Sequence, residues 1–105
     1  MSALTEASTN FDLENVKPFL VRLSTHVDGF GPAQIDPLVE DVAGMSVDAE
    51  KSWAFDVVHD GEPTPLHIRV FMDDEEAPDL YFFTSAALAA TINQEMKAYF
   101  DELGM

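Results

Sequence analysis

The spacing of apolar positions changes along the chain, and this change predicts helices before strands. Apolar residues recur with the period of a helix at Val16, Phe19, Leu20, Leu23 and Val27. The glycines and proline of "DGFGP" favour a stop after them. "IDPLVEDVAG" predicts a short second helix, with Asp36 as its cap and Pro37 as its first helical residue.

The period then falls to two, which predicts three strands. Three runs, which begin at Trp53, Leu66 and Leu80, have an apolar residue at every second position. The turn-rich segments "DGEPTP" and "DDEEAPD" separate these runs. Short connections of this kind favour an antiparallel meander. An apolar stripe at helical spacing returns after Ser85, which suits a cap, and predicts a final helix that stops at Gly104.

The predicted fold is therefore α+β: a three-stranded antiparallel meander packed with helices, in the order α-α(short)-β-β-β-α. Residues 1–10 are small and polar, and we expect them to form a mobile N-terminal tail. Residues 11–105 then form a single α+β domain, a length that suits one core.

The first hairpin also has a predicted register. If it closes symmetrically, His59 faces Leu66, and Asp56 falls opposite Arg69, the arginine of the predicted sheet. Opposite charges in directly facing positions favour a register. In this register His59 and His67 point to opposite faces, and we expect the histidines to lie at the surface rather than to share a metal.

One face of the predicted sheet is not simply polar. Extension of the register to the third strand puts Phe71 opposite Tyr81 and Arg69 opposite Phe83. The second face then carries these seven residues, which are the candidate site for a partner or ligand: Asp56, Val58, His67, Arg69, Phe71, Tyr81 and Phe83. An apolar patch on an antiparallel sheet often marks a contact. A helix of the same chain, a partner or second copy, and a small molecule are the three candidates to cover it.

Charge narrows the choice of partner. Twenty acidic and five basic residues give a net charge of −15. This charge repels nucleic-acid backbones and anionic membranes, so we expect no direct binding to either. It attracts a basic protein, and the predicted partner is a basic protein or a second copy of the chain. Solubility, or adaptation to high salt in a halophilic source, explains the same acidity without a partner.

The sequence shows no motif for catalysis or cofactor binding. The acidic segment "DDEEAPD" lacks the glycine and glutamate spacing of a calcium loop, and "GFGP" lacks the third glycine of a phosphate-binding turn. Cysteine is absent from the chain, and its first residues contain no basic or long apolar stretch. We therefore predict no catalytic residue, no metal ligand and no cofactor, and a cytoplasmic location.

Three functions fit these features. The first is a non-catalytic acidic interaction module of the inhibitor, immunity or chaperone type, either monomeric or homodimeric. The second is a small-ligand-binding domain or small enzyme that uses the aromatic face with Arg69. The third is an acidic mimic of nucleic acid. The acidity and the aromatic face favour the first.

Overall fold

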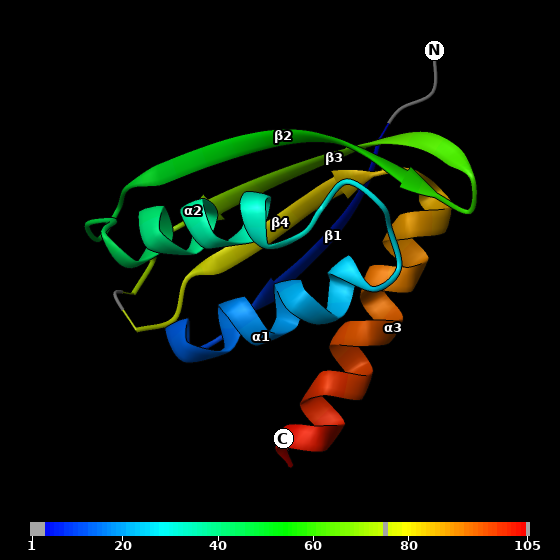
Figure 1. Ribbon diagram of the computed structural model, residues 1–105. Helices are drawn as coiled ribbons and strands as arrows, with labels where there is room; N and C mark the ends of the chain where they lie inside the picture. Colours follow the sequence, from blue (N-terminus) through cyan, green and yellow to red (C-terminus); the bar gives the residue numbers. More distant parts are fainter. Residues whose placement is uncertain (1–3, 75, 105) are drawn as a thin grey trace.

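A four-stranded antiparallel sheet and three helices form the fold in the computed structural model, which describes residues 4–74 and 76–104 (Figure 1). The elements are β1 (Thr5–Asn10), α1 (Leu13–Ser24), α2 (Pro32–Ala43), β2 (Glu50–His59), β3 (Glu62–Phe71), β4 (Asp79–Thr84) and α3 (Ala86–Leu103). The strands lie in the order β1-β4-β3-β2. The predicted α+β class and the β2-β3-β4 meander are confirmed, and the chain adds β1 at one edge.

β1 corrects the predicted mobile tail for residues 5–10, while residues 1–3 lie outside the described part of the chain. It pairs antiparallel with β4 and sets Ala7 opposite Phe82. Ala7 is buried, with 4% of its surface exposed. Asn10 fastens the end of the strand, because its side-chain amide donates to the Ala77 carbonyl and to the Asp79 carboxylate, both at 2.8 Å. A small apolar residue on one face and polar residues on the other suit an edge strand.

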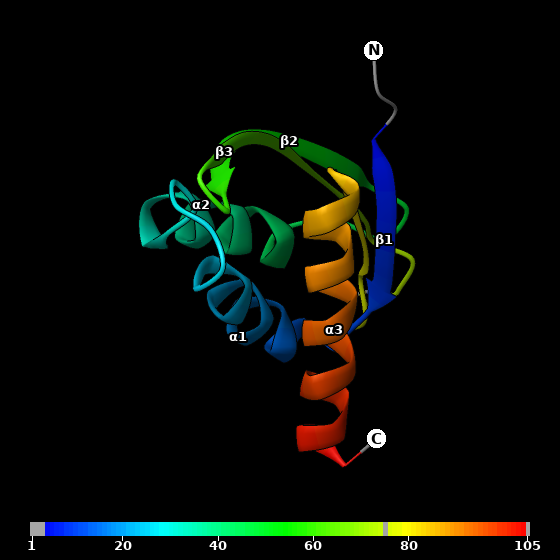
Figure 2. The ribbon, with the colours of Figure 1, turned by 90° about the vertical axis from the view of Figure 1, so that its right-hand side faces the viewer.

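All three described helices lie on the same side of the sheet (Figure 2). α3 runs along β1 and β4, and the β2-β3 hairpin curves over α2 (Figures 1 and 2). The core between the two layers comes from one face of the strands, including Leu66, Ile68 and Phe82, and from Phe19 and Ile92 of the helices. The other side of the sheet, called the outer face from here on, has no described element over it.

The register of the β2-β3 hairpin differs from the predicted one by four residues. His59 faces Glu62, not Leu66, and the turn contains only Asp60 and Gly61, which have φ values of 52° and 79°. Two central residues with positive φ match the tight hairpin turns that Asp-Gly favours. Because the shift is an even number of residues, every β2 side chain keeps the face that the sequence predicts for it.

Two prolines in β3 explain why the hairpin is longer than expected. Pro63 faces Val58, whose backbone N–H and carbonyl are both bonded to Asp28 at 2.9 Å, on the opposite side from β3. Pro63 and Pro65 therefore occupy positions that make no ladder bond to β2. On their other side β4 ends at Thr84, which faces Leu66. A proline is tolerated in such a position because no strand needs its missing N–H.

The helix ends show which capping signals decide the boundaries. α3 begins after Ser85, whose hydroxyl accepts a hydrogen bond from the Leu88 N–H at 3.2 Å, and ends at Gly104 in the left-handed region, as predicted. α2 begins at Pro32 rather than Pro37, because Pro32 already supplies the fixed φ of a first helical residue. The Gln34 side chain accepts from the Gly31 N–H at 2.8 Å and secures this earlier start.

Candidate functional site

All seven predicted site residues project from the outer face: Asp56, Val58, His67, Arg69, Phe71, Tyr81 and Phe83. Arg69 and the three aromatic residues are half-buried, whereas the other three are exposed. The sequence left open whether a helix of the same chain covers this face. None of the described elements covers it (Figure 2).

The predicted pair of Asp56 and Arg69 does not form. In the observed register Asp56 faces Pro65, and Arg69 faces Ser52. The two-residue turn therefore determines the register, which differs by four residues from the one that charge complementarity predicts. The consequence is a guanidinium whose strand neighbour is a small hydroxyl instead of a carboxylate.

Aromatic rings hold Arg69 in place from the other side. β4 sets Tyr81 opposite Arg69 and Phe83 opposite His67, two residues from the predicted pairing. The guanidinium carbon lies 4.9 Å from the centre of the Tyr81 ring and 5.5 Å from that of Phe83. Each such contact stabilises a cation by about 0.5–1 kcal/mol at exposed sites. The two rings thus position the planar guanidinium, and no acidic side chain of the described residues takes part.

Arg69 also has an unmet hydrogen-bond donor. Its side chain forms no ion pair with any described residue, and none of them accepts a hydrogen bond from its buried Nε. Leaving a buried donor unsatisfied typically costs about 1–3 kcal/mol.

A hollow lies beside this arginine. It has a volume of about 290 Å³ and is lined by Ser52, Trp53, Ala54, His67, Ile68, Arg69 and Phe83. The observed register explains it, because the small side chains of Ser52 and Ala54 face the long side chains of Arg69 and His67. The site therefore combines one fixed cation, an imidazole and a hydroxyl.

The margin of the outer face is acidic. By strand register and alternation, Glu6 of β1, Glu50 and Asp56 of β2 and Asp79 of β4 share this face with the rings. Val58 adds an exposed apolar side chain near the hairpin end, with 38% of its surface exposed. The face therefore has an aromatic centre with one arginine, inside a ring of carboxylates.

The parts of this site that depend on register and on β1 were not predicted from the sequence. Ser52 and Ala54 line the hollow only because of the four-residue shift. Ser8 of β1 lies opposite Tyr81 and extends the face beyond β4. The Asp-Gly pair at the turn was the signal for the first two, whereas "TEASTN" has one small apolar residue and a weak strand signal.

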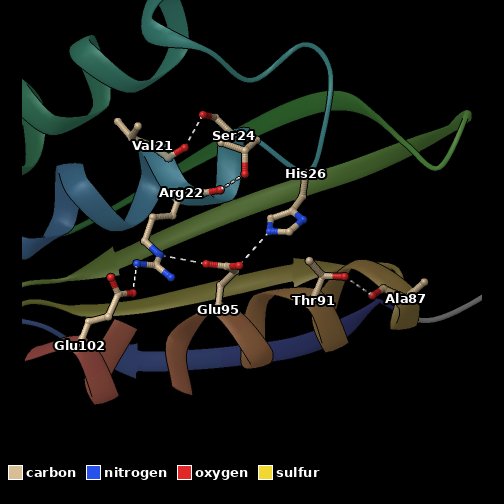
Figure 3. A network of polar contacts seen from close by, with 9 residues as sticks. Val21, Arg22, Ser24, His26, Ala87, Thr91, Glu95 and Glu102 are labelled. Atoms are coloured by element: carbon tan, nitrogen blue, oxygen red, sulfur yellow. Dashed lines mark hydrogen bonds and ion pairs between the residues drawn. The ribbon is translucent and has the colours of Figure 1, made fainter. Parts of the chain in front are cut away.

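A second polar cluster lies on the helical side of the molecule and ties α1 to α3 (Figure 3). The Glu95 carboxylate accepts hydrogen bonds from His26 Nε2 and from Arg22 Nε, both at 2.9 Å, and Arg22 also pairs with Glu102. The hydrogen bond from His26, followed by that from Arg22, lowers the pKa of Glu95. These contacts raise the pKa of Arg22 above its ordinary value. The cluster joins two helices and has no hollow of its own among those found.

Two other features of the chain contain ionisable side chains. A larger hollow of about 500 Å³ is lined by Asp12, Leu13, Glu14 and Glu76, so the ionisable groups found on its walls are acidic. His59 lies on the core side and is 8% exposed, which corrects its expected surface position. Within residues 4–74 and 76–104, no group of three histidine, aspartate or glutamate side chains could hold a metal ion. None of the described helices is long and apolar enough to cross a bilayer.

Comparison of the chain with protein families, with curated proteins and with solved structures finds no match. The outer face is therefore the feature from which a function can be inferred.

Proposed function

We propose that the protein is a non-catalytic interaction module that docks a basic protein partner on its outer face. The observation that carries this proposal is the uncovered face with half-buried rings at its centre, Phe71, Tyr81 and Phe83, around Arg69. Tyrosine and arginine are among the residues that contribute most at protein interfaces. A centre of this kind offers a partner apolar area that water currently contacts.

The charge of the chain decides which partner fits. The acidic residues at the margin of the outer face match a partner with basic residues around an apolar centre. The net charge of −15 attracts such a partner over distances longer than the contact and raises its association rate. A second copy of this chain would meet the same carboxylates with like charge, which makes the homodimer the weaker alternative.

Affinity capture with matched variants tests the proposal. The full chain is immobilised and exposed to native lysate at about 50 mM and about 500 mM salt, conditions that differ strongly in screening. The test variant carries Phe71→Thr and Tyr81→Thr, which remove two rings but keep residues suited to strands. The control is Val21→Thr on the helical side, where Val21 is 46% exposed.

The proposal predicts a salt-sensitive basic partner that the double variant loses and the control retains. Folding of each variant is checked by its urea midpoint, and the oligomeric mass of the free chain is measured in parallel. A folded double variant that retains every partner of the wild type would exclude the outer face. Self-association that the same variant abolishes, without a basic partner, would favour the homodimer instead.

A further inference from the structure

The hollow beside Arg69 has the chemistry of a carboxylate site. Its lining includes Arg69, His67 and Ser52, whose side chains can all donate hydrogen bonds. The Arg69 Nε is buried, and none of the described residues accepts a hydrogen bond from it. A planar carboxylate matches a guanidinium better than other small groups, because two oxygens can accept from two nitrogens.

The surroundings also favour a carboxylate over an apolar group. The rings of Tyr81 and Phe83 fix the guanidinium at 4.9 and 5.5 Å, so little freedom remains to be lost on binding. Ala54 leaves open the space that a larger side chain at this position of β2 would fill. The hollow, at about 290 Å³, lies just below the volumes typical of ligand pockets, so it is small for a cofactor and large enough for a side chain that carries a carboxylate.

Long-range charge indicates how such a group reaches the hollow. The net charge of −15 repels a free small anion on its approach to Arg69. A carboxylate carried on a basic protein is brought in by the attraction of the whole partner. We infer that the hollow is a subsite for an acidic side chain of the basic partner, an inference that rests on the proposed function.

The test uses two short lysine-rich peptides that differ only at the central residue, which is Glu in one and Gln in the other. Binding to the full chain is followed by NMR through the amide resonances of Ser52, Ala54, His67 and Arg69. Charge alone predicts tighter binding of the Gln peptide, because it carries more net positive charge. The subsite predicts the opposite order, with the Glu peptide binding about fivefold more tightly.

Two variants assign the preference to the hollow. Arg69→Gln removes the cation, and Ala54→Leu fills the space while Arg69 stays in place. Each is expected to abolish the preference for the Glu peptide, so the inference remains testable if one of them fails to fold. Val21→Thr on the helical side is the control and should leave the preference unchanged.

The outcomes separate this inference from the proposed function. If both peptides shift outer-face resonances but the Gln peptide binds equally well or better, the subsite is wrong and the basic-partner interface stands. If the peptides shift only helical resonances, both fail. Sodium acetate is the last arm: acetate binding as tight as that of the Glu peptide would identify a free small ligand and overturn the assignment to a partner side chain.

Discussion

The pairing of β1 with β4 makes a quantitative prediction for two adjacent residues. Ala7 points to the core, opposite Phe82, and is 4% exposed, whereas Ser8 is exposed on the outer face, opposite Tyr81. Ala7→Asp places a carboxylate at a buried position without a partner. Such a charge costs several kcal/mol, and we expect a loss of about 3–4 kcal/mol in the free energy of unfolding.

This loss is large beside the roughly 5–15 kcal/mol that stabilises a typical domain. With a urea dependence of about 2 kcal/mol per molar for a chain of this size, the midpoint should fall by roughly 2 M. The chain could also release β1, and the loss would then be limited to the free energy with which β1 docks. Hydrogen exchange distinguishes the two, because release removes the protection of the Thr5–Asn10 amides and leaves β3 protected.

Ser8→Asp is the matched control, since it adds the same group one residue away. Its expected effect is within about 0.5 kcal/mol, as for most exposed substitutions. Equal and small effects of the two substitutions, with unchanged hydrogen exchange, would show that residues 5–10 do not pack as β1. The mobile tail that the sequence favours would then be correct.

Three further predictions concern other parts of the fold. Because the pKa of Glu95 is lowered, Glu95→Gln should reduce the free energy of unfolding by about 1 kcal/mol at pH values above the ordinary carboxyl pKa. Urea unfolding at a series of pH values should show this difference vanish as the pH falls through the lowered pKa, and a difference that does not depend on pH would contradict it. Gly29→Ala should lower the melting temperature more than Gly61→Ala, because both residues have positive φ but only at Gly29 would a Cβ approach a backbone carbonyl, that of Asp56, at 3.2 Å. Equal decreases in melting temperature would refute this contact. Phe11→Ala should cost about 3–5 kcal/mol in urea unfolding, because the ring is 2% exposed and packs on three other rings; a loss below about 1 kcal/mol would exclude that packing.

The periodicity of the sequence was enough to predict the meander and the face of each strand residue. Alternation assigns Leu66, Ile68 and Val70 to the core and Arg69 to the other side, and this assignment is independent of any even shift in register. The caps of α3 were also predictable, because Ser85 and Gly104 act through local backbone geometry. These features depend on residues that are close together in the sequence, so one sequence is enough to predict them.

The remaining features depend on competition between distant segments. The Asp56–Arg69 pair argued for one register, but a surface ion pair contributes little beside a favourable two-residue turn at Asp60 and Gly61. β1 has too little apolar surface to be recognised, and Ala7 becomes informative only once Phe82 and α3 provide a place to bury it. The hollow beside Arg69 depends on the observed register and therefore could not be predicted from the sequence.

Two histidines of the same chain provide the most direct test of whether a basic partner occupies the outer face. His67 lies exposed on the outer face, and His26 lies exposed on the helical side. Each is modified with an acylating reagent in the free chain and in the complex with its captured partner, and the two rates are read by mass spectrometry. A basic partner on the outer face should slow the modification of His67 in the complex and leave the rate at His26 unchanged. Protection of His26 with no protection of His67 would contradict a partner at that face.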